Sequence, residues 1–408
     1  MIKNTVGFLK EFSLPLIFGV VMAILFANIN EEAYRELLLT PLFFNHAPLM
    51  ILGHEMDLQF IFNDIFMVFF FGIAAVEITQ SVLPGGSLNP ISRALNPLFG
   101  TLGGVLGPAV TYLSLCYLLN MPKNVWGGWG IPTATDIALA WLFARLIFGK
   151  HHPAVSFLLL LAVADDGIGL IIIAIFYPDP SAPVNIIFLL ITGGAMALAY
   201  LFRRLKVMSF WPYILICGSI SWTGLLMAHL HPALGLVFVI PFMPKDKSST
   251  GQIGELFEDE EGQHGPLVTF EHSFKTFVDF GLLGFGITNA GVAFSQVGEM
   301  TLIVFLSLLI GKTFGVFSFS YLADRFGLKL PEGMNFRTLF TTGIVAGLGL
   351  TVALFVAGQA FAKPEDADIQ SAAKMGAIFS AGIGVIAFVV SRLLGIKKID
   401  SLPEHTPT

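Results

Sequence analysis

Two adjacent acidic residues, Asp165 and Asp166, interrupt an otherwise apolar run of the sequence. Two further charges, Asp136 and Lys312, stand in comparable apolar surroundings. A charged side chain at the centre of a bilayer costs about 2.5 to 3.5 kcal/mol on insertion scales, so such residues are rare in membrane segments. Those that remain face a cavity or a partner and mark transport pathways. These four residues are therefore the candidate functional groups of the chain.

The paired carboxylates suit an exchange between protons and a small cation. Neighbouring residues of a helix point about 100° apart, so both side chains can border one cavity while facing different partners. In a low-dielectric site two close carboxylates cannot both stay charged cheaply, which favours the protonated form. A deprotonated carboxylate offers the hard oxygen ligands that small cations prefer. Competition of protons and a cation for one carboxylate is antiport in its simplest form.

Lys312 requires a counter-ion, because an unpaired ammonium group in an apolar segment is costly. Asp165 is as well explained by that structural role as by ion exchange. The lysine is either a static member of an ion pair or a titrating group that is released when the pair breaks. The residues alone leave both alternatives open.

Composition identifies the class of protein. The chain has 408 residues, of which 55% are hydrophobic and 12% charged, and its mean hydropathy is +0.79. Soluble globular proteins carry about 25% charged residues, so this chain has too little polar surface to be one. A net charge of −6 and the absence of a basic stripe in the sequence indicate no nucleic-acid partner. The two cysteines, Cys116 and Cys217, lie in apolar runs and are expected to be buried thiols.

Apolar stretches predict an all-α polytopic membrane protein that forms a single transmembrane domain over residues 1–408. A bilayer core requires about 20 apolar residues per helix. By this measure we expect about twelve transmembrane helices, the eighth of them short, at residues 12–29, 61–83, 95–119, 125–148, 154–177, 184–203, 210–228, 232–243, 276–294, 299–322, 336–361 and 373–395.

The distribution of basic residues tests this count. With the N-terminus in the cytoplasm, the cytoplasmic connections carry 17 of the 22 Lys and Arg residues, the opposite side carries 4, and Lys312 remains inside a span. Cytoplasmic loops of membrane proteins carry such an excess of basic residues. The bias predicts that both termini are cytoplasmic. It also predicts an acidic cytoplasmic loop at residues 244–272 and a cytoplasmic tail at residues 396–408.

The fourth and eleventh predicted spans contain residues that disrupt helices. Glycines and Pro132 precede Asp136 in the fourth, and Gly347 and Gly349 interrupt the eleventh. Unwound backbone at membrane depth occurs only in protein or around a cavity, and paired interrupted segments point to a transporter site. Helix ends carry partial charges, so Asp136 suits N-terminal ends and Lys312 suits C-terminal ends. Ordinary small-residue packing is the alternative for the two glycines alone.

Several motifs together resemble the NhaA family of bacterial sodium/proton antiporters. They occur in the family's order and extend over nearly the whole chain. The matching motifs are Asn63-Asp64, Ile131-Pro-Thr-Ala-Thr-Asp-Ile-Ala, Asp165-Asp166-Gly, Thr288-Asn289-Ala-Gly291, Ile310-Gly-Lys312 and Gly347-Leu-Gly-Leu-Thr351.

The resemblance implies specific roles for these residues. Spans 3–5 and 10–12 would be inverted repeats, with unwound spans 4 and 11 crossing at the midplane. Asp166 would be the principal carboxylate for the cation and the proton. Asp165 would pair with Lys312 and assist binding, with Thr135 near the cation. Asp136 and Lys312 would offset the dipoles of the broken helices.

The activity implied is secondary active exchange of Na⁺ or Li⁺ for protons across a bacterial inner membrane. Transport would be electrogenic and would proceed by alternating access, without enzyme activity or an organic cofactor. Glu77 and His231 match positions connected with the pH response of the family. A homodimer is expected, with residues 37–58 as the contact segment.

The chain departs from the family pattern in the second span. The family usually has Gly-Leu-Glu followed by basic residues there, whereas Glu77 is followed by Ile-Thr-Gln. The acidic loop is also longer than expected, so regulation is the feature that these departures affect most. The alternative functions for a chain with such buried charges are an organic-anion/Na⁺ symporter, an intramembrane aspartyl protease, and a membrane sensor that has lost transport.

Overall fold

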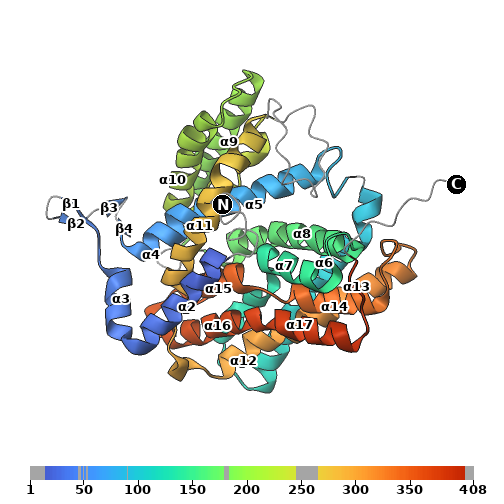
Figure 1. Ribbon diagram of the computed structural model, residues 1–408. Helices are drawn as coiled ribbons and strands as arrows, with labels where there is room; N and C mark the ends of the chain where they lie inside the picture. Colours follow the sequence, from blue (N-terminus) through green and yellow to red (C-terminus); the bar gives the residue numbers. More distant parts are fainter. Residues whose placement is uncertain are drawn as a thin grey trace, which may run out of the picture. The chain divides into compact units, whose positions relative to one another are not determined.

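The computed structural model describes residues 14–44, 47–48, 50–51, 54–89, 91–178, 183–244 and 265–399. Over these ranges the protein is helical apart from two small hairpins (Figure 1). The all-α class predicted from the sequence is therefore confirmed. The hairpins pair β1 (Phe43–Phe44) with β2 (Ala47–Pro48) and β3 (Met50–Ile51) with β4 (His54–Glu55).

The chain divides into two compact units. Unit 1 comprises Met1–Pro90, Leu170–Val297 and Gly358–Ser371, and unit 2 comprises Ile91–Gly169, Gly298–Ala357 and Ala372–Thr408. The prediction of a single transmembrane domain remains a prediction.

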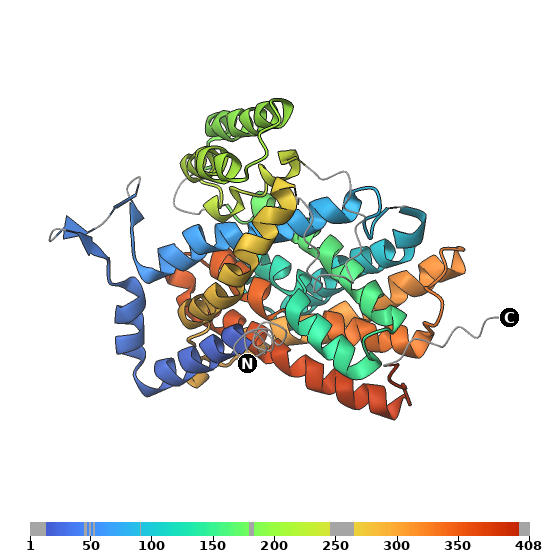
Figure 2. The same ribbon diagram turned by 45° about the horizontal axis from the view of Figure 1, so that its top comes forward.

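Unit 1 is built around the contact between its first and its longest helix. A Cβ atom added at Gly19 of α2 would lie 2.3 Å from the carbonyl oxygen of Leu283 in α11, so only glycine permits this approach of the two backbones. α3 and the hairpins lie at the outer edge of the unit in both views (Figures 1 and 2). The helices of unit 1 are α2 (Leu14–Ile29), α3 (Glu31–Leu39), α4 (Leu58–Phe60), η1 (Ile61–Phe66), α5 (Met67–Val82), η3 (Ile186–Phe188), α9 (Leu189–Arg204), η4 (Tyr213–Gly218), α10 (Ser219–Met227), η5 (Pro232–Leu234), η6 (Ile240–Phe242), α11 (Pro266–Asn289), η7 (Phe294–Gln296) and η9 (Pro364–Asp366).

Unit 2 holds the segments that carry the candidate charges. Its α6 and α13 cross at glycines: a Cβ at Gly103 would lie 2.1 Å from the Gly315 carbonyl oxygen, and the reverse distance is 2.0 Å. Small residues at a crossing let helix backbones approach closely in a membrane. The helices of this unit, three of which extend past its boundaries, are α6 (Ile91–Leu118), η2 (Val125–Thr133), α7 (Ile137–Phe148), α8 (Pro153–Phe176), α12 (Glu299–Leu306), η8 (Ser307–Lys312), α13 (Thr313–Arg325), α14 (Phe336–Ala346), α15 (Leu350–Ala360), α16 (Ala367–Phe379), η10 (Ser380–Gly382) and α17 (Ile383–Leu393).

The length and the apolar character of the helices limit how many of them can cross a membrane. Within the described ranges, six helices are long and apolar enough to cross a membrane, or up to eight if each bent pair is one span. The bent pairs are η2 with α7, at 49°, and α14 with α15, at 47°. They occupy the two segments in which glycine and proline predicted interruptions. The count of twelve remains a prediction.

Two of the predicted spans differ clearly from the structure. Residues 232–243 contain two short 3₁₀ helices, η5 and η6, instead of one continuous helix. Pro232 and Pro241 have no N–H group to donate, so they favour helix starts rather than helix interiors. α11 begins at Pro266, before the predicted start of that span at residue 276. Its first turn therefore belongs to the segment predicted as acidic loop.

Several predictions fall outside the described residues. The acidic residues 255 and 258–261 of the predicted loop do so, as do residues 400–408 of the tail and parts of the predicted contact segment 37–58. Cys116 and Cys217 are both free and buried, as expected.

Candidate functional site

Asp136 lies at the break between η2 and α7, and its carboxylate also contacts the second bent pair, near the start of α15. Its Oδ1 accepts a hydrogen bond from the Leu139 amide at 3.1 Å, which caps α7. Its Oδ2 accepts from both the amide, at 3.1 Å, and the hydroxyl of Thr351 near the start of α15. Its own amide donates to the Leu348 carbonyl oxygen at 2.6 Å. One buried carboxylate thus satisfies and offsets the positive N-terminal ends of two helices.

Lys312 and Asp165 form a fully buried ion pair. The Nζ atom of Lys312 lies 2.5 Å from Oδ2 of Asp165, and neither side chain is exposed. Lys312 also donates to the carbonyl oxygen of Thr133, the last residue of η2. A cation there complements the negative C-terminal end of that helix. The lysine therefore holds together α8, η2 and η8.

Thr135 completes the surroundings of Asp165. Its hydroxyl lies 2.7 Å from Oδ2 of Asp165 and 3.0 Å from the carbonyl oxygen of Ala346, on the other bent pair. The second oxygen of Asp165, Oδ1, is buried and accepts no hydrogen bond from any described residue. Buried carboxylate oxygens are normally satisfied, so this one is available to a proton or a cation.

Asp166 differs from its neighbour in accessibility. The residue as a whole is half-buried, although its Oδ1 atom is buried, whereas Asp165 is completely buried. It also acts electrostatically on Lys312, which places its charge near the ion pair. Because the two residues are consecutive in α8, one carboxylate faces Lys312 while the other remains partly accessible. The structure thus gathers Asp136, Thr135, Asp165, Asp166 and Lys312 in unit 2.

The start of α8, which carries both aspartates, is capped by His152. Its Nδ1 atom accepts a hydrogen bond from the Ala154 amide at 3.0 Å, and its ring packs against Phe148 with 5.2 Å between ring centroids. Burial lowers the pKa of His152, because the charged imidazolium is desolvated there. The folded state therefore favours the neutral, hydrogen-bond-accepting ring.

A test of this cap is the substitution His152→Ala. At pH 8 it should reduce the free energy of unfolding by about 1 kcal/mol, the usual effect of losing an N-cap. The cap is fully present above the ordinary histidine pKa of about 6.5 and is lost as pH falls through the lower folded value. The difference from the unmodified protein should therefore shrink towards pH 5. Thermal unfolding in detergent measures this, with exposed His151→Ala as control, and an equal loss at both pH values would contradict it.

Sequence reasoning missed two partners of the breaks. The sequence indicates Thr351 only as part of a motif, although its amide and hydroxyl both contact Asp136. The Ser380 hydroxyl oxygen accepts a hydrogen bond from the Gly349 amide at 3.2 Å, and no sequence pattern predicts this contact. A hydroxyl residue just after a glycine-rich interruption is the signal that could have identified Thr351, because such residues satisfy free helix-end groups.

Glu77 and His231 belong to unit 1. Glu77 is half-buried in α5 and interacts electrostatically with Lys275, Glu271 and Asp279 of α11. The Nζ atom of Lys275 in turn lies 4.0 Å from Oε1 of Glu271. A cation therefore faces Glu77 from another helix, although no basic residue follows it in the sequence.

His231 caps η5 and lies close to a carboxylate. Its Nδ1 atom is 3.9 Å from Oδ1 of Asp64, and it accepts from the Ala233 amide at 3.4 Å. Asp64 lies in η1, and its backbone carbonyl oxygen accepts a hydrogen bond from Nε1 of Trp222. The two residues predicted for regulation thus lie in unit 1, while the paired aspartates lie in unit 2.

Comparison with known proteins identifies the family. Residues 9–391 match the family described as Na⁺/H⁺ antiporter 1. The chain belongs to this family. It is 55% identical over 397 residues to the Na⁺/H⁺ antiporter NhaA of Desulfitobacterium hafniense, covering 97% of this chain and 98% of the relative. It is 52% identical to the Na⁺/H⁺ antiporter NhaA of Geobacter sulfurreducens, covering 97% and 100%.

Among solved structures, the sodium proton antiporter MjNhaP1 of Methanocaldococcus jannaschii aligns with a TM-score of 0.48 at 13% identity. The alignment covers 94% of this chain and 99% of that structure.

Membership of the Na⁺/H⁺ antiporter 1 family establishes the activity. The chain is a Na⁺/H⁺ antiporter, so Na⁺ and protons are the ions that it exchanges. Its family is one of transporters, and its long apolar helices make it a multi-pass membrane protein. The resemblance inferred from the motifs is thereby confirmed.

Proposed function

We propose that this antiporter exchanges Na⁺ or Li⁺ for protons at Asp166 and Asp165. The observation that carries the proposal is the contrast between the two carboxylates. Asp165 is sealed against Lys312 with one unsatisfied oxygen, while Asp166 beside it is only half-buried. This arrangement supports a site in which ions reach the partly accessible Asp166 first and then the buried, incompletely satisfied Asp165.

Asp166 is the principal carrier in this mechanism. When deprotonated, it attracts a cation that has lost part of its water shell. Oδ1 of Asp165 and the hydroxyl of Thr135 are further oxygen ligands within the same part of unit 2. Oxygen ligands of this kind suit hard monovalent cations. Protons arriving from the other side displace the cation from the same oxygens.

Lys312 and Asp136 support the site without carrying the ion. Lys312 holds Asp165 until the cation competes for that carboxylate, and the pair re-forms when the cation leaves. Both oxygens of Asp136 already accept hydrogen bonds from helix ends, so this carboxylate is engaged by the two breaks. Asp136 therefore holds the starts of α7 and α15 next to each other.

Transport is electrogenic in this scheme, because Asp166 releases one proton and Lys312 releases a second when the cation takes Asp165 from it, so two protons exchange for one monovalent cation. The two bent pairs support unwound spans 4 and 11 that cross within inverted repeats, and alternating access follows from their rearrangement. Twelve spans in a bacterial inner membrane, with both termini in the cytoplasm, complete the topology.

Glu77 and His231 regulate the response to pH, and a homodimer forms through residues 37–58.

Reconstitution in vesicles that contain a pH-sensitive dye tests the proposed function. After addition of NaCl, LiCl or KCl across pH 6 to 9, Na⁺ and Li⁺ should drive proton movement, and K⁺ should not. A membrane-potential dye measures electrogenicity in the same vesicles. Absence of Na⁺- or Li⁺-dependent proton movement at every pH would refute the proposal.

A further inference from the structure

A basic surface at one end of unit 2 takes no part in the ion exchange proposed above. It is formed by the end of α7 with the turn that follows it, by the connection from α13 to α14, and by the end of α17. Residues 145–153, 321–337 and 388–399 carry eight Lys or Arg residues and two acidic residues, Asp324 and Glu332. We name this surface the basic collar, with members Arg145, Lys150, Arg325, Lys329, Arg337, Arg392, Lys397 and Lys398.

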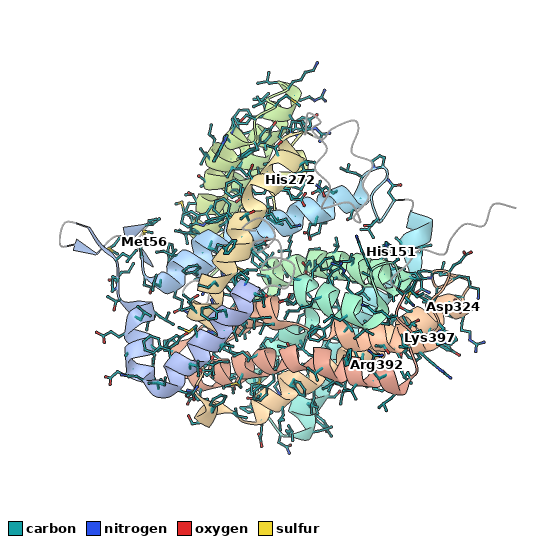
Figure 3. The ribbon with its side chains drawn as sticks, in the orientation of Figure 1. Met56, His151, His272, Asp324, Arg392 and Lys397 are labelled. Atoms are coloured by element: carbon teal, nitrogen blue, oxygen red, sulfur yellow. The ribbon has the colours of Figure 1, made fainter. Side chains whose placement is uncertain are left out.

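Direct contacts bring the three segments of the basic collar together. The amide of Ile399 donates to the Phe148 carbonyl oxygen at 2.8 Å. Nη1 of Arg337 donates to the Leu394 carbonyl oxygen at 3.4 Å. The rings of Tyr321 and Phe336 lie 5.0 Å apart. Figure 3 shows His151, Asp324, Arg392 and Lys397 at the same end of the unit.

Three arginines of the basic collar share an arrangement with an aromatic ring. Each guanidinium lies over a ring four residues earlier in its helix: Arg145 over Trp141 at 4.3 Å, Arg325 over Tyr321 at 5.2 Å and Arg392 over Phe388 at 5.0 Å. Aromatic rings at the ends of apolar helices lie at the level of the lipid headgroups, and long basic side chains there extend to the same level.

Four charges of the basic collar have no ion-pair partner in the part of the chain that the structure describes. Among the described residues, Arg325, Arg337, Arg392 and Lys397 are exposed and form no ion pair. Asp324 pairs instead with Lys329 at 3.7 Å. A guanidinium stacked on a ring keeps N–H groups at its edge that can donate to phosphate oxygens. These four exposed residues therefore present donors suited to phosphate without an anionic partner among the described residues.

We infer that the basic collar binds the headgroups of anionic phospholipids. The headgroup phosphates complement both its charge and its position at helix ends, and basic residues near such a surface attract it electrostatically. The collar includes residues 394–399, which bond to α7 through Phe148 and to α14 through Arg337. These are members of the two bent pairs, so a bound lipid stabilises the ends of both broken segments.

The test uses the full chain in mixed micelles of detergent and a zwitterionic phosphatidylcholine. Phosphatidylglycerol is added stepwise, and the thermal unfolding temperature gives the half-saturating concentration. The variant R325Q/R392Q/K397Q removes three exposed charges of the collar. The matched control R35Q/K123Q/K363Q removes three exposed charges from outside the collar.

Phosphatidylglycerol should raise the unfolding temperature of the unmodified protein and the control alike. The collar variant should need on the order of 10- to 100-fold more of this lipid, since each basic residue strengthens attraction to an anionic surface. Added salt should weaken the effect. Equal behaviour of the collar variant and the control would overturn the inference. So would an equal effect of added phosphatidylcholine, or of inorganic phosphate, which would indicate a site for free anions. None of these readouts depends on transport.

Discussion

Asp166→Asn should abolish Na⁺- and Li⁺-dependent proton movement in reconstituted vesicles. Asparagine has nearly the same shape but can neither release a proton nor supply a negative charge. Both halves of the exchange are therefore lost, and the initial rate should fall by about 100-fold or more, as expected when a positioned proton-transfer group is removed. The fold should persist, because Asp166 is only half-buried and Lys312 is held directly by Asp165.

The control for this variant is Asp368→Asn, which changes an exposed carboxylate in α16 in the same way. It should exchange ions at the rate of the unmodified protein. Near-normal exchange by Asp166→Asn, with normal thermal stability, would show that another carboxylate carries the ion. Asp165 would then be the first alternative, because its Oδ1 is unsatisfied.

The second large effect is expected for Lys312→Ala. This change leaves the carboxylate of Asp165 buried without its ion-pair partner and also removes the hydrogen bond to Thr133. Breaking one side of a buried pair destabilises proteins by about 3 to 5 kcal/mol. We expect a lower unfolding temperature and a change in the charge moved per cation, with Na⁺ binding retained at Asp166.

A double-mutant cycle separates the ion pair from other effects of this change. Lys312→Met combined with Asp165→Asn should be much less destabilised than the sum of the two single variants, because contacting residues of this kind are coupled. Lys363→Ala, which removes an exposed lysine, is the control. If Lys312→Ala retains normal stability and normal charge movement, the proposed role of the pair is wrong.

The membrane class and the positions of the breaks could be predicted from the sequence. Low charge content and long apolar runs exclude a soluble protein, and glycine and proline disfavour continuous helix. Both effects are local, so they need no knowledge of tertiary contacts. The family resemblance implies the pairing of Lys312 with Asp165, and the structure contains this ion pair.

Contacts made by ordinary residues could not be predicted in the same way. The position of Thr351 after a glycine-rich break suggests that it satisfies a helix end, but only the fold shows that its partner is Asp136. Lys275 faces Glu77 from a helix almost 200 residues away in sequence, so the second span alone suggested a missing cation. The hydrogen bond from the Ile399 amide to the Phe148 carbonyl oxygen joins two backbone groups. Nearly every residue type has these groups, so the sequence does not show which of them will pair.

Proton release on Na⁺ binding is the most direct test of competition at the paired aspartates. The purified protein in weakly buffered detergent solution near pH 8 is mixed with NaCl, LiCl or KCl in the presence of a pH-sensitive dye. The account predicts acidification with Na⁺ and Li⁺, none with K⁺, and none with any salt for Asp166→Asn. If Na⁺ releases no protons from the unmodified protein, or releases them equally from Asp166→Asn, the exchange at Asp166 is contradicted.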